Sequence, residues 1–235
     1  MNKKYIIHVP SSKKSLDSAI RSIKIAKQVG KIEVELWDGV DKRNSWTMME
    51  DRQMKMRSVN DSYISSGYMD CEIGAFLSHM SLWEKCIELD ERILIMEHDA
   101  TFQDEFTHEY YDGILNFGIP NWGSRVWDDV KESGVVERGD CDKFHDPHDV
   151  YNPNNCRCDT KWLFGAHTYS ITPRVAKILI DDARTNGIYA LDRFIRTDLV
   201  NIADYLPHIT RQDSDFTLIQ KKHRTKLISA NEAWK

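Results

Sequence analysis

Residues 5–37 have the sequence YIIHVPSSKKSLDSAIRSIKIAKQVGKIEVELW, in which two apolar runs flank a segment with helical periodicity. Residues 5–9 form a short run rich in β-branched side chains, and residues 32–37 alternate between apolar and polar. Between them, Ser15 is a suitable N-cap and Gly30 lies where a helix would end. The apolar residues of this segment recur at helical spacing: Leu16, Ala19, Ile20, Ile23, Ala26 and Val29. The stretch therefore predicts a strand, a helix and a second strand.

A unit of this length favours two parallel strands joined by a right-handed crossover, the start of a doubly wound nucleotide-binding architecture. The chain has 235 residues, of which 41% are apolar and 29% charged, as is typical of one globular domain. We therefore expect an α/β fold that is Rossmann-like, with a mostly parallel sheet flanked by helices in a single domain.

Three further elements follow from periodicity. From Glu72 onward, apolar residues recur on one helical face, which predicts a buried helix. Residues 92–96 form an apolar run without alternation, as expected of a central strand covered on both faces. Thr172 is the expected N-cap of a helix that begins at Pro173 and ends at Gly187.

Other segments lack such periodicity. Residues 38–70 are polar and rich in methionine, which predicts an irregular excursion. A strand is expected near residues 124–127, and the crowding of Asp, His, Asn, Pro and Cys in residues 128–160 predicts a loop region.

Composition excludes some classes of protein. With 32 basic and 37 acidic side chains, the net charge is −5, which excludes a globally basic nucleic-acid binder but not a local basic patch. No apolar run reaches the ~18 residues that cross a bilayer, and the run behind Lys3 and Lys4 is too short for a signal peptide. We expect no transmembrane segment and a cytoplasmic location, where five cysteines favour thiols over a disulfide framework.

Glu97 and Asp99 follow the predicted central strand, at the carboxyl end where open α/β sheets bind ligands. Two residues apart on an extended strand tip, they point to roughly the same side. Their oxygens suit Mg²⁺ or Mn²⁺, which would neutralise charge on a leaving diphosphate. The pair alone is equally compatible with two acids that end a strand in solvent.

Several blocks, in order along residues 5–217, resemble the family 25 glycosyltransferases, the lipooligosaccharide-biosynthesis and collagen-galactosyltransferase group. CEIGAFLSH (71–79) and ILIMEHDA (93–100), with LWEK between them, resemble Gly-Glu-Ile-Gly-Cys, Leu-Ser-His, Trp and a strand ending Leu-Glu-Asp-Asp-Ala. GAHTYSITP (165–173) resembles Gly-Thr-His-Ala-Tyr-(Ile/Leu)-Ile-Ser-Pro. LDRF (191–194) and SDF (214–216) resemble Val-Asp-x-x-(Ile/Leu) and Ser-Asp-Ile.

This resemblance implies a GT-A-like fold, a nucleoside diphosphate sugar donor (UDP-sugar first), Mn²⁺ or Mg²⁺ at an acidic triplet, and inversion at the anomeric carbon. Glu97 and Asp99 match the outer acidic positions and are the implied metal ligands. The middle position is His98, which either contacts the ribose or a metal-bound water or has no ligand role. Residues 8–12, HVPSS, stand where the family has Asn-Leu-x-Arg.

The same correspondence implies the other site residues. An inverting transfer needs a general base for the acceptor hydroxyl, with Asp192 as the first choice and Asp215 as the second. His79 and His167 either bind the diphosphate and support the site or are satisfied core residues. The implied donor-binding residues are His8, Val9, Asp38, Gly39, Ser78, His79, Glu97, His98 and His167.

The resemblance divides the chain into a donor half (residues 1–100), an acceptor-side half (101–217) and a basic tail (218–235). The acceptor is a surface glycan of the lipooligosaccharide type or hydroxymethylcytosine in phage DNA. The basic cluster at residues 221–226 suits a membrane face or DNA phosphates, or is a solvated tail.

One cluster favours a different class of protein. Its cysteine and histidine side chains are of the types that bind zinc, although the spacing of these residues in the sequence matches no standard zinc-binding pattern. The cluster consists of Cys141, His145, His148, Cys156 and Cys158. It is either a plain acceptor-side loop or a zinc site, and zinc would favour a binding module with a decayed glycosyltransferase core.

Overall fold

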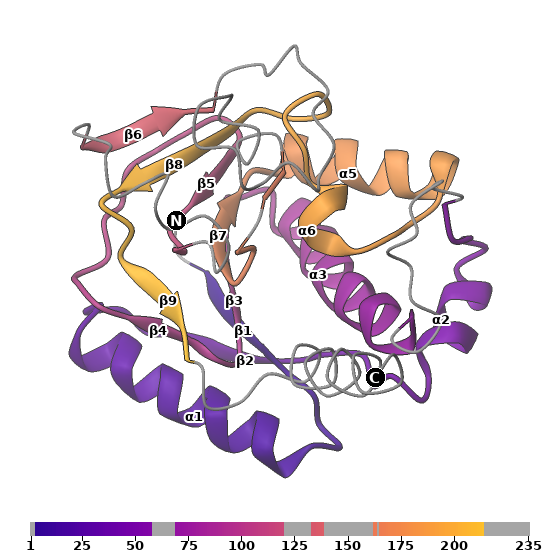
Figure 1. The fold of residues 1–235 in the computed structure, drawn as a ribbon, viewed down its shortest axis with the longest axis horizontal. Coiled ribbons are helices and arrows are strands. Elements are labelled where there is room, and N and C mark those ends of the chain that lie inside the picture. The colour runs from indigo at the N-terminus through magenta and orange to yellow at the C-terminus, as the bar shows by residue number, and fades with distance from the viewer. Residues whose placement is uncertain (1–2, 58–68, 120–132, 139–161, 164, 214–235) are drawn as a thin grey trace, which may run out of the picture.

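The computed structural model describes residues 3–57, 69–119, 133–138, 162–163 and 165–213. The helices are α1 (Lys13–Gln28), α2 (Ser45–Asp51), α3 (Met69–Leu89), α5 (Pro173–Asn186) and α6 (Leu191–Phe194). The strands are β1 (Lys4–His8), β2 (Glu35–Asp38), β3 (Ile93–Glu97), β4 (Ala100–Phe102), β5 (Ile114–Asn116), β6 (Gly134–Glu137), β7 (Thr168–Ile171), β8 (Ile202–Leu206) and β9 (Thr210–Gln212). They form a seven-stranded sheet in the order β2-β1-β3-β7-β5-β8-β6 and a two-stranded sheet of β4 and β9 (Figure 1).

The seven-stranded sheet is mixed. β1 runs parallel to β2 and β3, and β5 runs parallel to β8. β7 is antiparallel to both β3 and β5, and β6 is antiparallel to β8. The α/β class and the flanking helices are confirmed. The sheet is also mostly parallel in strand direction, because β1, β2, β3, β5 and β8 all run the same way and only β7 and β6 are reversed.

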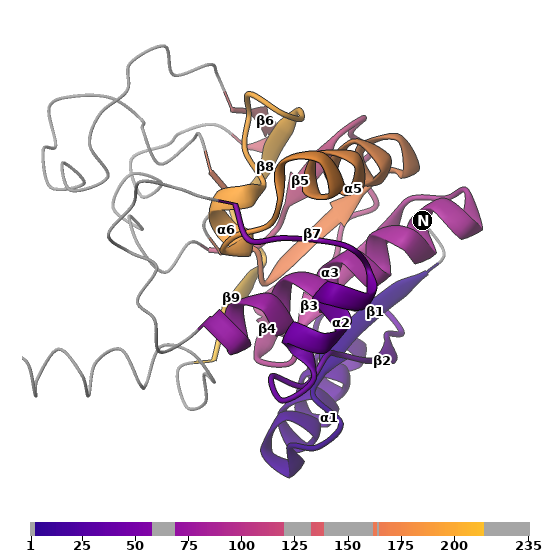
Figure 2. The same ribbon diagram turned by 90° about the vertical axis from the view of Figure 1, so that its right-hand side faces the viewer.

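Side chains of β1 and β3 alternate between two hydrophobic cores, as the period of an extended strand requires. Tyr5 and Ile95 face the core that contains residues of α3 and α5, whereas Ile6 and Leu94 face the core that contains Ala19 of α1. Figures 1 and 2 show α1 on one side of these strands and α3 and α5 on the other. β3 is therefore covered on both faces, as its unbroken apolar run predicts.

The helix ends agree with the sequence in most respects. α1 ends before Gly30, but its N-cap is Ser12, whose Oγ accepts a hydrogen bond from the Ser15 amide at 3.2 Å. The prediction of Ser15 was wrong because its buried hydroxyl instead accepts from the Val9 amide, at 3.0 Å, and joins the helix to β1. At α5, Thr172, Pro173 and Gly187 hold the predicted positions, although the Thr172 side chain makes no capping bond.

Two segments predicted to be irregular contain regular structure. α2 lies within residues 38–70, and Met49 and Met54 from this segment are buried in the core. β6 lies within residues 128–160 and pairs with β8. In both cases tertiary contacts order a stretch that has no periodicity of its own. The strand expected near residues 124–127 lies outside the described residues.

A buried ion pair ties the far strands together. Arg138, after β6, donates from Nε to Asp204 Oδ2 at 2.6 Å and from Nη2 to Asp204 Oδ1 at 2.7 Å. Asn116 of β5 donates to the same Asp204 Oδ1 at 2.8 Å, and His208 also contacts this oxygen. Burial alone would raise the pKa of Asp204, but the charge of Arg138 and these hydrogen bonds hold it well below its usual range.

We expect Arg138→Leu to lower the free energy of unfolding by about 3–5 kcal/mol, because the Asp204 charge would stay buried without its partner. Arg174→Leu is the matched control, since Arg174 and Asp112 form an exposed pair at 3.1 Å. Its loss should cost at most about 1 kcal/mol. Urea denaturation measures both, and equal effects of the two substitutions would contradict the assignment of a stabilising role to the buried pair.

Candidate active site

The reversal of direction at β7 gathers polar residues at one edge of the sheet. β1, β2 and β3 end there with His8, Asp38 and Glu97, and His8 is paired with Asp38 in the strand register. β7 begins at the same edge, where the Glu97 amide donates to the His167 carbonyl at 2.8 Å. Four residues predicted from separate parts of the sequence therefore lie at the same edge of the sheet.

Glu97 lies next to His79 at this edge. Its Oε1 lies 3.5 Å from His79 Nε2, and its side chain is 30% exposed. Burial alone would raise the pKa of Glu97, but the hydrogen bond from His79 holds it below its usual value. Glu97 is therefore an ionised carboxylate at neutral pH.

The pKa of Asp99 is shifted in the direction opposite to that of Glu97. It is buried, its Oδ2 accepts from Gln212 Nε2 at 2.9 Å, and its Oδ1 has no hydrogen-bond partner among the described residues. Burial first, and then the charge of Glu97, raise the pKa of Asp99 well above its ordinary value. The alternative of two acids ending a strand in solvent is wrong for Asp99, because it is enclosed by β9.

Glu97 and Asp99 are the residues at this position that could hold a divalent cation. Within the described ranges, no group of three or more His, Cys, Asp or Glu side chains is arranged to hold a metal ion. Mg²⁺ is commonly held by one or two carboxylates, with phosphate and water oxygens completing its shell. The unsatisfied, buried Oδ1 of Asp99 near the Glu97 charge is the kind of oxygen that a cation would satisfy.

The predicted donor residues of β1 and β2 meet where these two neighbouring strands end. His8 Nε2 lies 2.9 Å from Asp38 Oδ1, with the His8 ring buried and the Asp38 side chain 80% exposed. The Gly39 amide donates to the His8 carbonyl at 2.7 Å, and a Cβ at Gly39 would lie only 2.9 Å from Ile7 Cγ2. Val9, half-buried, follows His8. The end of β2 places the Asp38 carboxylate at the surface, where a ligand can reach it.

Ser78 supports the segment after β2 through a hydrogen bond from the Val40 amide. Its Oγ donates to the Gly74 carbonyl at 2.6 Å and accepts from the Val40 amide at 2.8 Å. Its only proton is therefore used within the protein. Ser78 contacts this edge of the sheet through the backbone of Val40, which follows Asp38 and Gly39. A direct contact between Ser78 and a donor sugar stays a prediction.

His98 and His167 flank Glu97 with different surroundings. His98 is half-buried, and burial, followed by the charge of His8, lowers its pKa although the Glu97 charge opposes this. His167 is buried, and mainly this burial lowers its pKa to about 4. Neither ring nitrogen of His167 has a hydrogen-bond partner of normal geometry in the described part of the chain, although the Thr210 backbone is close. Both rings are neutral at physiological pH.

Asp192, the first choice for the base, is brought to the same region by α6. It is half-buried, and burial raises its pKa, with Arg193 opposing and the Glu97 charge adding to the rise. Glu72, at the start of α3, has a pKa raised by burial and by Asp192. Asp215 and the Cys141–Cys158 cluster lie outside the described residues.

Sequence reasoning missed four residues that shape this edge. Glu72, Trp83 and Tyr169 lie inside the blocks that resemble family 25, and this was the available signal for them. Gln212 binds Asp99 across 113 residues of sequence, and no local pattern indicates such a pair.

Comparison with known proteins identifies the class. A family model described as glycosyltransferase family 25 (LPS biosynthesis protein) matches residues 1–195. This match identifies the molecule as a glycosyltransferase. The edge of the sheet at which β1, β2 and β3 end is its candidate active site. Because the match spans most of the 235 residues, the chain belongs to glycosyltransferase family 25.

Comparisons with solved structures and with curated proteins do not refine this assignment. The structure of the galactosyltransferase LgtC, in complex with donor and acceptor sugar analogues, aligns with a TM-score of 0.42 and 11% identity, over 97% of this chain and 95% of that chain. No curated protein matches the sequence. Among the described residues, no helix has the length and apolar character needed to span a membrane.

We expect Gly118→Ala to destabilise the protein by crowding the His167 ring at the edge of the sheet. A Cβ at position 118 would lie 2.5 Å from His167 Nε2 and 2.9 Å from the Gly165 carbonyl oxygen, so ring or backbone must move. Overpacking of this kind costs about 1–3 kcal/mol, measurable by urea denaturation. If the ring is the main obstacle, adding His167→Ala should recover much of the loss, and a strictly additive double variant would contradict this.

Proposed function

We propose that the chain transfers a sugar from a nucleoside diphosphate sugar, UDP-sugar first, to a hydroxyl of a surface glycan, with inversion and with a requirement for Mn²⁺ or Mg²⁺. The observation that carries the proposal is the buried, unpartnered Asp99 Oδ1 near the ionised Glu97, at the carboxyl edge of β3. Membership of family 25 supports the donor class.

In this mechanism, Glu97 and Asp99 hold the cation. When bound, a divalent cation neutralises the charge that develops on the departing diphosphate. The hydrogen bond from His79 holds Glu97 in its ionised form, and Gln212 fixes one oxygen of Asp99 so that the other is available. Asp38, exposed beside the buried His8, is placed to accept hydrogen bonds from donor hydroxyls.

Asp192 takes the proton of the acceptor hydroxyl as that oxygen attacks the anomeric carbon. Inversion requires the base to lie on the face of the sugar opposite the leaving diphosphate. Burial raises the pKa of Asp192, and a more basic carboxylate is a better proton acceptor near neutral pH. Asp215 stays the second choice, outside the described residues.

The choice of acceptor rests on the family description, which names LPS biosynthesis and so supports a glycan. The net charge of −5 gives no support to DNA, and the basic cluster at residues 221–226 lies outside the described residues. Hydroxymethylated DNA is therefore the alternative acceptor, and the assay described next tests it in parallel with the glycan. A zinc-binding module with a decayed core is disfavoured, because both Glu97 and Asp99 remain at the edge.

The test is an assay of purified protein with a panel of nucleotide sugars, with and without Mn²⁺, that measures release of nucleoside diphosphate. Lipooligosaccharide and hydroxymethylcytosine DNA are offered as acceptors in parallel, and NMR of the product gives the anomeric configuration. Metal-dependent transfer to the glycan with inversion supports the proposal. Transfer only to DNA overturns the acceptor, and retention of configuration overturns the role of Asp192.

We expect Asp99→Asn to reduce transfer at least ~100-fold, because losing several kcal/mol of charge stabilisation has that effect on rate. Its stability without metal should be unchanged or higher, because the raised pKa of Asp99 shows that folding disfavours its charge. Asp104→Asn, at an exposed position, is the control and should keep full activity. Full activity of Asp99→Asn would remove the metal-ligand role.

We expect Asp192→Asn to lower kcat by about 10²–10⁴ with little change in the KM for the donor, as removal of a general base does. In the wild type, kcat should fall as the pH falls through the raised pKa of Asp192, and the variant should lack this acid limb. Asp198→Asn, on the exposed loop after α6, is the control. A preserved acid limb in Asp192→Asn would assign the base elsewhere.

A further inference from the structure

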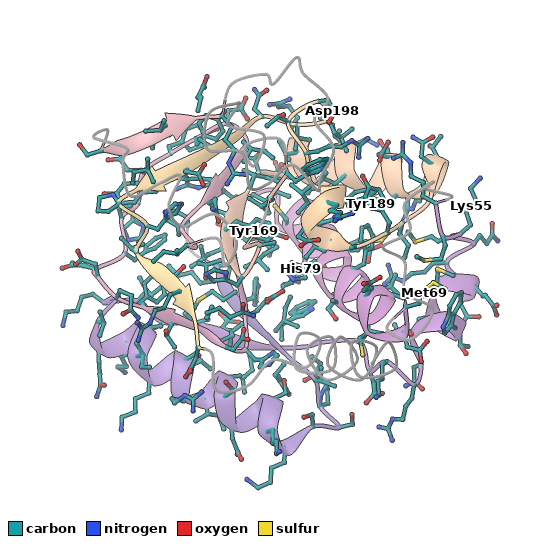
Figure 3. All side chains as sticks on the ribbon, viewed as in Figure 1. Lys55, Met69, His79, Tyr169, Tyr189 and Asp198 are labelled. Atoms are coloured by element: carbon teal, nitrogen blue, oxygen red, sulfur yellow. The ribbon has the colours of Figure 1, made fainter. Side chains whose placement is uncertain are left out.

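Three buried side chains form a continuous chain of contacts that ends at Glu97. Trp83 Nε1 donates to Tyr169 Oη at 2.9 Å, and Tyr169 Oη lies 2.9 Å from His79 Nδ1. His79 Nε2 then faces Glu97 Oε1 at 3.5 Å. Figure 3 shows His79 on α3 and Tyr169 on β7 close together near the middle of the molecule. Trp83 and Tyr169 are fully buried, and His79 is 1% exposed.

The direction of each hydrogen bond in this chain follows from the inventory of donors. The indole N–H of Trp83 can only donate, so Tyr169 Oη accepts there and has one proton left to give. Burial raises the pKa of Tyr169, so the phenol keeps that proton. If His79 Nδ1 donated instead, the Tyr169 proton would have no acceptor among the described residues, and an unsatisfied buried hydroxyl is costly. Tyr169 therefore donates to His79 Nδ1.

This direction decides the tautomer of His79. A neutral ring that accepts at Nδ1 carries its proton on Nε2, and Nε2 is the nitrogen that faces Glu97. The His79 and Tyr169 rings stack with an interplanar angle of 9° and centroids 5.7 Å apart, which restricts rotation of the imidazole. His79 thus presents an N–H group to Glu97 in a fixed direction.

We propose that Tyr169, oriented by Trp83, is a positioning residue that locks His79 in its Nε2–H tautomer and thereby fixes the carboxylate of Glu97. The role of Glu97 as a cation ligand rests on the proposed function, whereas the tautomer lock does not. Neither Trp83 nor Tyr169 is placed to touch a substrate, so both act through His79. Outer hydrogen-bond partners of this kind commonly decide the tautomer and orientation of a ligand-bearing group.

The direct test is long-range ¹⁵N NMR of protein labelled at histidine, which distinguishes the protonated from the unprotonated ring nitrogen. The His79 signals are assigned by their loss in His79→Gln. We expect Nδ1 unprotonated and Nε2 protonated in the wild type, and a mixture of tautomers in Tyr169→Phe. An Nδ1–H tautomer in the wild type, or an unchanged tautomer in Tyr169→Phe, would overturn the inference whether or not the protein transfers sugar.

A second measurement examines the consequence for Glu97. We expect Tyr169→Phe to raise the Mn²⁺ concentration for half-maximal activity by about 10–100-fold, the usual effect of losing an outer-shell partner. His79→Gln, which keeps a donor near the position of Nε2, should retain more activity than His79→Leu. Ser170→Ala is the matched control, since this neighbour on β7 is buried and its hydroxyl has no hydrogen-bond partner among the described residues.

The outcomes of the two measurements are distinguishable. Lack of nucleoside diphosphate release by the wild type would overturn the proposed function and leave the tautomer result standing. An active Tyr169→Phe with an unchanged metal requirement would overturn the positioning role, as would equal losses in His79→Gln and His79→Leu. Thermal unfolding of each variant confirms that the comparison is made between folded proteins.

Discussion

The antiparallel pairing of β3 with β7 is the constraint on which the candidate active site depends. It joins strands that are far apart in the sequence, with Met96 opposite Thr168 and the Glu97 amide bound to the His167 carbonyl at 2.8 Å. A parallel neighbour would bring its carboxyl end to this edge. The reversed strand brings its first residues instead, and with them the histidine and tyrosine that surround Glu97.

The same pairing explains why a polar chain can lie inside an apolar core. Successive residues of β7 point to opposite faces, so Tyr169 enters the core shared with α3, where it meets Trp83 and His79. A buried polar group is costly unless it is hydrogen-bonded, and each of these side chains has a partner. The result is a rigid connection from the packed core to a half-buried carboxylate at the edge.

Much of the donor half could be predicted because its signals are local. Residues 5–37 contain a complete strand-helix-strand pattern, and the helix from Glu72 and the strand before Glu97 have clear periodicity. The resembling blocks supplied the site residues, which periodicity alone could not. No local pattern encodes the antiparallel strands β6 and β7 or the hydrogen bond from Gln212 to Asp99, because each depends on a partner far away in the sequence. Ser12 displaced Ser15 as N-cap because the Ser15 hydroxyl had a better partner inside the fold.

Glu97 and Asp99 are two residues apart, yet the fold shifts their pKa values in opposite directions. The hydrogen bond from His79 favours the charge of Glu97, whereas burial and the charge of Glu97 itself disfavour a charge on Asp99. Separating two neighbouring carboxylates in this way is a common means of giving them different chemical roles. Under the proposed function, a dication between them would supply the positive charge that Asp99 lacks, and the unpartnered Asp99 Oδ1 would be the oxygen that accepts it.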